Sequence, residues 1–229
     1  MRRSLFCQNC YMVHAICYMN LVILGPQGSG KGTQAKLLAE KFGLDHFDTG
    51  CALRQVAKLD TPLGREVYEI QNVTKTLVPS RILREILHIR LDDLGREQGV
   101  VFDGVPRNID QAGYFEQALG EFGRKIDRVI FVDISKEESL KRIGKRFSCE
   151  KCKEAVVLKE DDQNLICLKC SGKLVQRVDD TKEGIEKRLS IFMEETIPVI
   201  EYFENKKLVS RIDGSKSPNE VFEDILKIL

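Results

Sequence analysis

The sequence predicts an α/β fold, a doubly wound five-stranded parallel sheet with helices on both faces, on the basis of three observations. Short apolar runs alternate with amphipathic segments along the chain after residue 18. The first run leads directly into a glycine-rich loop and then a helical pattern. Polar residues follow the ends of several runs, and the carboxyl edge of a parallel sheet would gather them in one crevice.

The expected elements alternate as a parallel sheet requires. The expected strands are residues 21–24, 44–47, 99–102, 129–132 and 208–212. The expected helices are the segment after Lys31, residues 53–59, 64–73, 80–94 and 109–122, a segment capped by Ser135, and residues 181–202 and 221–229. Ser135 with Glu138 three residues later is typical of a helix N-terminus, as is Ser217 before Pro218.

Composition limits the possible classes of protein. The chain has 229 residues, of which 42% are hydrophobic and 31% charged, so a packed core in one domain with inserts is expected. The formal net charge of +1 gives no sign of a polyanionic partner, so we expect no nucleic acid. No apolar run approaches the ~18 residues of a membrane span, so we expect no membrane association.

Residues 1–18 precede the first expected strand. Gln8, Asn9 and His14 interrupt their apolar character, which makes them a poor core for a signal peptide. We interpret residues 1–18 as a poorly ordered N-terminal extension rather than a targeting segment.

The loop after the first strand has the composition of a phosphate-binding loop. Residues 21–33 read LVILGPQGSGKGT, which fits G-x-x-x-x-G-K with Gly32 next and the hydroxyl one residue later, at Thr33. The glycines let successive backbone N–H groups face inward, and the N-terminus of the following helix adds partial positive charge. Lys31 supplies a full charge, so the loop predicts a nucleotide phosphate site.

Four of the eight cysteines form two C-x2-C pairs separated by 14 residues, namely Cys149, Cys152, Cys167 and Cys170. Two such knuckles can place four thiolates in a tetrahedron, which suits a structural zinc ion with no open position. Disulfides are the alternative, which the reducing cytoplasm expected for a phosphate-loop protein disfavours. Residues 155–158 and 165–166 are expected to form a two-stranded ribbon around an acidic turn at 160–162.

Arginines and carboxylates recur at strand ends and near the cysteine pairs. They are Asp48, Arg54, Asp103, Arg107, Arg142, Lys145, Arg146, Arg177, Asp179, Asp180 and Arg188. A single surface arginine is usually a solvated charge, but several beside a phosphate loop fit phosphoryl transfer, which needs concentrated positive charge and alignment.

From Met19 to the end the chain resembles the adenylate kinases of the long-lid, zinc-containing type, within the P-loop NTPases. The motifs that carry the resemblance are GPQGSGKGTQ at 25–34, TG-x3-R at 49–54, DGVPR at 103–107 with Gln111, and QRVDD at 176–180. The resemblance implies a nucleoside monophosphate kinase for the reversible reaction ATP + AMP = 2 ADP, which maintains adenine nucleotide balance. It also implies Mg²⁺ as cofactor and a cytoplasmic monomer.

The resemblance also assigns roles to individual residues. Its ATP-binding set is Gly28, Ser29, Gly30, Lys31, Gly32, Thr33, Arg142 and Lys216. Its AMP-binding set is Thr49, Arg54, Val78, Gly104, Arg107, Gln111, Arg177 and Arg188. Its catalytic set is Lys31, Arg107, Arg142, Arg177 and Arg188, with Asp103 ordering magnesium through water and Asp179 and Asp180 positioning arginines. Within 19–229, residues 49–78 would form a helical insert over AMP, and residues 145–182 a zinc-ribbon lid over ATP.

Several positions depart from the family pattern, among them Cys51, Val105 and Lys145. Cys51 replaces an Asp that is common after Thr-Gly, and the loss of that carboxylate implies a change in rate or metal affinity. Val105 replaces an aromatic residue beside the AMP base, so weaker AMP binding is expected. Lys145 takes a position often held by Arg, where a point charge replaces a bidentate fork.

Two alternative functions remain at this stage. A UMP or CMP kinase would share the loop, but those enzymes usually have a short lid without zinc, and a substrate panel would distinguish them. A zinc-ribbon nucleic-acid-binding protein is the other, supported by Lys151, Lys153 and Lys169. The acidic residues around those lysines offset their charge, and the ribbon has no aromatic platform for bases.

Overall fold

The computed structural model describes residues 18–74, 76–95, 98–152, 155–158, 165–176 and 182–229. The predicted N-terminal extension lies outside these residues except for Tyr18. Arg177, Asp179 and Asp180 also lie outside them, so their predicted roles rest on the sequence alone.

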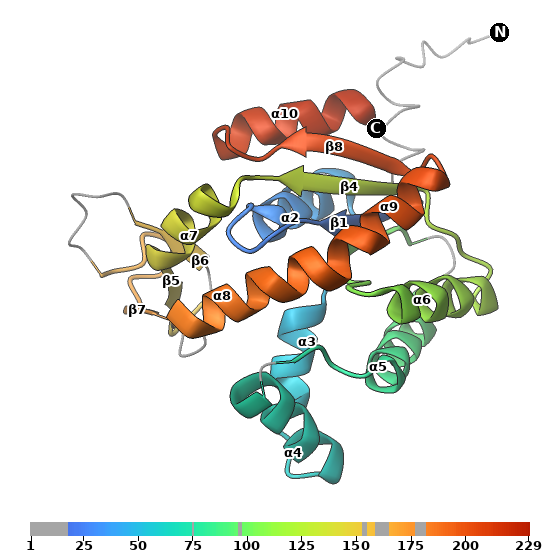
Figure 1. The fold of residues 1–229 in the computed structure, drawn as a ribbon, viewed down its shortest axis with the longest axis horizontal. Coiled ribbons are helices and arrows are strands. Elements are labelled where there is room, and N and C mark those ends of the chain that lie inside the picture. The colour runs from blue at the N-terminus through green and yellow to red at the C-terminus, as the bar shows by residue number, and fades with distance from the viewer. Residues whose placement is uncertain (1–17, 75, 96–97, 153–154, 159–164, 177–181) are drawn as a thin grey trace, which may run out of the picture.

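The centre of the fold is a parallel sheet of five strands (Figure 1). The strands are β1 (Asn20–Leu24), β2 (Asp45–Asp48), β3 (Val100–Asp103), β4 (Arg128–Asp133) and β8 (Val209–Asp213), in the order β2-β3-β1-β4-β8. Every neighbouring pair is parallel, which confirms the predicted doubly wound sheet. Each strand lies within one residue of its predicted position. For β1, β3 and β4 the reason is that a run buried on both faces is largely apolar, whereas β2 and β8, at the sheet edges, are partly exposed and more polar.

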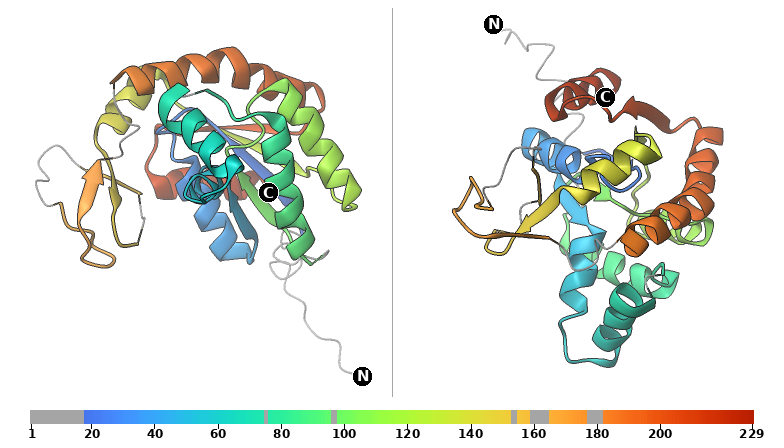
Figure 2. Two further views of the ribbon diagram at one scale, coloured as in Figure 1. Left: turned by 90° about the horizontal axis from the view of Figure 1, so that it is seen from below. Right: turned by 60° about the vertical axis from the view of Figure 1, so that its left-hand side comes forward.

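Helices cover both faces of this sheet. Helices α2 (Lys31–Phe42) and α10 (Pro218–Ile228) lie over one face, and α5 (Ser80–Asp93), α6 (Ile109–Glu121) and α9 (Ile197–Asn205) over the other (Figure 2). Strand β1 contributes to both hydrophobic cores. Leu21 and Ile23 pack in the core beneath α2 and α10, while Val22 and Leu24 pack in the core beneath α5, α6 and α9. The alternation follows from the two-residue period of a strand. The layers leave the carboxyl ends of β1, β2 and β3 at one edge.

Side-chain caps define several helix starts. Ser135 Oγ accepts from the Glu138 N–H at 3.1 Å and begins α7 (Lys136–Gly144), as predicted. Ser217 and Glu220 form a reciprocal capping box at α10. These caps satisfy N–H groups that would otherwise lack a partner in the first turn.

A helical segment follows β2 and contains α3 (Thr49–Val56), α4 (Pro62–Glu69) and the π-helical turn η1 (Ile70–Thr74). The predicted starts at residues 53 and 64 were too late. Asp48 caps α3 through the Cys51 N–H at 2.8 Å, and Thr61 caps α4 through the Gly64 N–H at 3.0 Å. In Figure 2 this segment projects away from the sheet.

The segment after α7 is a three-stranded antiparallel sheet of β5 (Arg146–Cys149), β6 (Ala155–Val157) and β7 (Leu174–Gln176), in the order β6-β5-β7. The predicted two-stranded ribbon is therefore wrong. Residues 155–157 pair with β5 instead of with 165–166, and Ile166 makes only an isolated bridge to Lys173. Strand β5, which ends at Cys149 in the first cysteine pair, is central because both β6 and β7 pair with it.

A helical arm leads from this sheet back to the core. It consists of α8 (Lys182–Ile191), the π-helical turn η2 (Phe192–Thr196) and α9. One uninterrupted helix over 181–202 was predicted, and the extra residue per turn in η2 is invisible in an apolar periodicity. Within the described residues, no helix combines the length and apolar character needed to cross a membrane.

Candidate active site

The loop after β1 curls around its own backbone N–H groups. Gly28 and Gly30 have φ of +79° and +90°, which L side chains rarely adopt, and Gly30 is the N-cap of α2. A Cβ at Gly28 would lie 3.2 Å from the Ser139 carbonyl oxygen, so the loop also packs closely on α7. The buried Ser29 hydroxyl has no hydrogen-bond partner among the described residues. The loop therefore has the geometry of an anion cradle.

Lys31 begins α2 beside this loop. Its ammonium donates to the Pro26 carbonyl oxygen at 3.3 Å. Removal from water is the largest influence on this group and lowers the pKa of Lys31 to about 8. The charges that modify the shift, in decreasing order, are those of Asp103, Arg107, Arg146 and Asp48.

Arg107 lies in the same electrostatic neighbourhood. Burial is the main cause that lowers the pKa of its guanidinium. Its charged neighbours, in decreasing order of influence, are Asp103, Asp48, Arg188 and Arg54. Asp48 and Asp103 are register partners at the carboxyl ends of adjacent strands, so their side chains leave the sheet on the same side. The structure thus brings Lys31, Arg54, Arg107 and Arg188 around one pair of carboxylates.

The loop between β3 and α6 holds Arg107 by side-chain contacts. The Arg107 Nε donates to the Gly104 carbonyl oxygen at 2.7 Å, and its backbone N–H donates to Gln111 Oε1 at 2.9 Å. Gln111 is buried and donates in turn to the Val78 carbonyl oxygen at 3.1 Å. The Thr196 hydroxyl donates to the Arg107 carbonyl oxygen at 2.9 Å. Both ends of the Arg107 backbone are therefore fixed.

Helix α3 carries the other residues predicted for the AMP side. Thr49 is its first residue and is buried, and the Thr49 hydroxyl has no hydrogen-bond partner within the described part of the chain. Arg54 folds back over the first turn, because a Cβ at Gly50 would lie 3.0 Å from Arg54 Nη1. Cys51, the family departure, lies in that turn, with Gln55 Nε2 3.8 Å from its sulfur.

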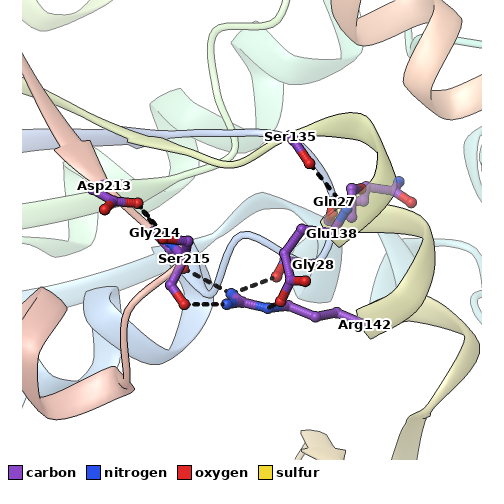
Figure 3. A network of polar contacts seen from close by, with 9 residues as sticks. Gln27, Gly28, Ser135, Glu138, Arg142, Asp213, Gly214 and Ser215 are labelled. Carbon is purple, nitrogen blue, oxygen red and sulfur yellow. Dashed lines mark hydrogen bonds and ion pairs between the residues drawn. The ribbon is translucent and has the colours of Figure 1, made fainter.

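Arg142 on α7 contacts two loops, the phosphate loop and the loop before α10 (Figure 3). Its guanidinium donates to the carbonyl oxygens of Gly214 at 2.8 Å and Ser215 at 3.0 Å, and reaches Gly28 at 3.4 Å. The Arg142 Nε also donates to Glu138 Oε1 at 2.6 Å. Arg142 thus joins the phosphate loop to the loop before α10. The next residue of that loop, Lys216, pairs with Asp224 at 2.6 Å, an ion pair that raises the pKa of Lys216.

Two residues of the cluster, Arg146 and Asp48, were listed from the sequence among the charges that fit phosphoryl transfer but were given no individual role. Arg146 begins β5 and lowers the pKa of Lys31, and the preceding residue, Lys145, is the C-cap of α7. Asp48 acts on both Lys31 and Arg107. The adjacency of Arg146 to the preceding basic residues and of Asp48 to Thr-Gly was visible in the sequence. Their proximity to Lys31 depends on strand register and on the position of β5, and neither of these could be read from the sequence.

The four cysteine thiols form a cluster within 4.8 Å of one another. The Cys149–Cys170 and Cys152–Cys167 sulfur distances are 3.4 and 3.6 Å, too long for disulfide bonds. A tetrahedron with zinc–sulfur distances of about 2.3 Å has edges of about 3.8 Å, which this cluster approaches. Hydrogen bonding from the Cys152 backbone is the largest cause that lowers the pKa of Cys149 to about 6. The cluster could hold a metal ion.

Comparison with known proteins gives the same family throughout. The family model described as Adenylate kinase matches residues 23–208. An adenylate kinase of Clostridium tetani is 38% identical over 213 residues, covering 92% of this chain and 98% of the relative. One of Methanothrix thermoacetophila is 38% identical over the same coverage, and one of Staphylococcus epidermidis is 37% identical, covering 92% and 99%.

The chain belongs to the adenylate kinase family. It is a phosphotransferase of the nucleoside monophosphate kinase type, with the reaction ATP + AMP = 2 ADP. The match spans almost the whole of these relatives, so the family assignment includes the helical segment after β2 and the cysteine cluster.

Proposed function

We propose that this chain transfers the terminal phosphoryl group of ATP to AMP by means of one cationic cluster that faces both nucleotides. The observation that carries the proposal is that Lys31 and Arg107 share the neighbours Asp103 and Asp48. Lys31 and the amides of the phosphate loop would hold the ATP phosphates, while Arg54 and Arg107 would hold the AMP phosphate. The attacking AMP phosphate is already anionic, so the scheme needs no general base.

The charged groups between the two phosphates would stabilise the transition state. Lys31, Arg146 and Arg188 contribute positive charge from α2, β5 and α8, and Arg177 is assigned from the sequence. Charge on the equatorial oxygens of the transferring group is stabilised by fixed cations more strongly in a water-poor site than in water. Arg146 is our addition to this set, on the basis of its effect on Lys31.

The two bases would bind on opposite sides of this cationic cluster. On the AMP side, Gln111 joins the loop that carries Gly104 and Arg107 to Val78, and these residues with Thr49 would bind AMP. The buried Thr49 hydroxyl, which has no partner among the described residues, supports a contact to the base. On the ATP side, Arg142 and the backbone near Lys216 join the loop before α10 to the phosphate loop.

The residues present fit a magnesium ion that accompanies ATP. Asp103 presents a carboxylate toward the phosphate loop, since its Oδ2 lies 3.1 Å from the position of a Cβ on Gly32. Magnesium prefers oxygen ligands and keeps several waters, so Asp103 would hold the ion through water. When bound, the ion neutralises phosphate charge.

We further propose that the cysteine cluster holds a structural zinc ion. Four thiolates leave no coordination position open, and a lowered pKa of Cys149 favours the thiolate that zinc binds. Gly172 supports the tight packing of this cluster, because a Cβ there would lie 2.7 Å from Cys149 Sγ.

The helical segment within 49–78 and the cysteine-bearing segment within 145–182 are proposed to cover AMP and ATP respectively. Closing both would exclude water, which otherwise accepts the phosphoryl group. The monomeric state, the cytoplasmic location and the absence of nucleic acid or membrane partners stay predictions.

A coupled assay of ADP formation tests the proposal. We expect turnover with ATP plus AMP and at least tenfold less with UMP or CMP. A preference for UMP or CMP would contradict the adenine assignments. Salt-sensitive binding of RNA or DNA without phosphoryl transfer would instead favour the nucleic-acid alternative.

A further inference from the structure

Thr196 is a buried polar residue in the helical arm, far in sequence from the phosphate loop. It ends the π-helical turn η2 and is 4% exposed. Its hydroxyl does not bond back to its own helix but donates to the carbonyl oxygen of Arg107, 89 residues earlier, at 2.9 Å. This bond joins the helical arm to the loop that carries the proposed AMP-phosphate arginine.

The Arg107 backbone depends on this bond because it lies outside the sheet and before α6. Its N–H is taken by Gln111 and its carbonyl by Thr196, so no helix or sheet ladder holds it. Gly104, with φ of +75°, allows the chain to turn back so that Arg107 Nε meets the Gly104 carbonyl. The conformation of this loop is therefore set by side chains from α6 and η2.

The same helical arm carries Arg188, eight residues before Thr196 and about 12 Å away along a helix axis. Arg188 is close enough to Arg107 to lower its pKa. The arm itself is anchored, because Val199, Ile200 and Phe203 are buried in the core. Phe192 also stacks on Phe131 of β4, with ring centroids 6.3 Å apart.

We propose that Thr196 is a positioning residue for phosphoryl transfer, fixing Arg107 relative to the helix that carries Arg188. The inference rests on the proposed role of Arg107 at the AMP phosphate. Both arginines would then be placed by one continuous helical arm. A hydroxyl at this position, rather than an apolar side chain of the same size, is what the reaction needs.

The expected effect follows from geometry. Without the hydroxyl, the Arg107 carbonyl loses its donor and the loop relaxes, which moves the guanidinium away from the AMP phosphate. Displacements of about 1 Å in a positioning group can cost up to a hundredfold in rate. Within the part of the chain that the structure describes, Thr196 makes no hydrogen bond to the phosphate loop, so we expect ATP binding to be unaffected.

The test compares Thr196→Val, which keeps the shape and removes the donor, with Thr196→Ser, which keeps the donor. We expect Thr196→Val to lower kcat/KM for AMP by about tenfold while KM for ATP changes less than twofold, and Thr196→Ser to retain most activity. Equal losses in the two variants, or equal losses for both nucleotides, would overturn the inference. If Thr196→Val does not fold, Thr196→Cys, with its weak donor, takes its place beside Thr196→Ser.

Arg107→Ala separates this inference from the proposed function. If Arg107→Ala leaves AMP kinetics unchanged, the proposed function fails. If Arg107→Ala impairs the AMP step and Thr196→Val does not, only the role of Thr196 fails. The double variant should be no worse than Arg107→Ala alone, because Thr196 acts through Arg107 and coupled residues are not additive.

Discussion

The loops after β1 and β3 end at the same edge of the sheet but are held in place differently. The phosphate loop is fixed by local backbone contacts, such as Ser29 N–H to the Pro26 carbonyl at 3.2 Å and Gln34 N–H to the Gly30 carbonyl at 3.0 Å. The loop that carries Arg107 depends on Gln111 and Thr196. The backbone of the phosphate loop is therefore held largely by bonds within the loop and its helix, with contacts from Ser139 and Arg142 of α7 added from outside. Within the described ranges, the Arg107 backbone has only side-chain partners, one of them 89 residues away.

The largest effect expected from this comparison is at Lys31. Lys31→Met should lower kcat on the order of a thousandfold, since it removes the full charge from a site built of partial charges. Steady-state ADP formation measures the effect. Lys41→Met, in the exposed last turn of the same helix, is the matched control and should change kcat less than twofold. A smaller loss at Lys31 than at Arg107 would mean that the backbone amides alone suffice for ATP.

The next effect separates the two loops. Arg107→Ala should lower kcat/KM for AMP about a hundredfold and change KM for ATP less than threefold, because its guanidinium faces the acceptor. Arg146→Ala should show the opposite pattern, since Arg146 acts on Lys31. Initial-rate kinetics with each nucleotide varied in turn measures both. If both variants changed the kinetic constants for ATP and AMP in the same way, the division into an ATP loop and an AMP loop would be contradicted.

The difference between the two loops explains which parts of the site could be predicted from the sequence. The phosphate loop is contiguous in sequence, so its glycines, Lys31 and the flanking strand and helix were all predicted. Thr196 and Arg146 could not be assigned in the same way, because their roles depend on contacts across 89 residues and on a strand, β5, that the predicted ribbon omitted. Side-chain patterns specify local conformation well, but long-range proximity needs the register of the whole sheet.

The segment with the cysteine cluster differs from both loops, because we expect a bound metal ion, rather than a large hydrophobic core, to stabilise it. Purified enzyme should contain about one zinc per chain, and Cys149→Ser should lose it and lower the melting temperature by several degrees. Metal analysis and calorimetry measure these outcomes. Cys51→Ser, at a cysteine outside the cluster, should keep the zinc. Zinc-free enzyme with an unchanged melting temperature would contradict a structural metal.

A smaller effect should appear as proton uptake when ATP binds. Burial holds the pKa of Lys31 at about 8, so part of the free enzyme carries a neutral Lys31 at pH 8. Bound phosphates raise this pKa, so binding should take up about half a proton at pH 8 and almost none at pH 6. Calorimetry in buffers of different ionisation enthalpy measures the uptake. Uptake that persists in Lys31→Met would assign it to another group.

The smallest effect concerns the packing behind the AMP loop. Val105 borders a pocket between α5 and α6 whose other walls include Phe47, Leu83, Leu87 and Phe115. Val105→Leu should fill part of it and raise the stability by about 0.5–1 kcal/mol, or a melting temperature higher by roughly 1–4 °C.

Val105→Leu also tests whether apolar packing or hydrogen bonding sets the position of the loop that carries Arg107. Because Gln111 and Thr196 hold the Arg107 backbone independently of Val105, KM for AMP should change less than threefold. Val100→Leu, at a fully buried position of β3 away from this pocket, is the control and should destabilise by overpacking. A large change in KM for AMP with Val105→Leu would mean that apolar packing, and not the contacts of Gln111 and Thr196, sets the position of Arg107.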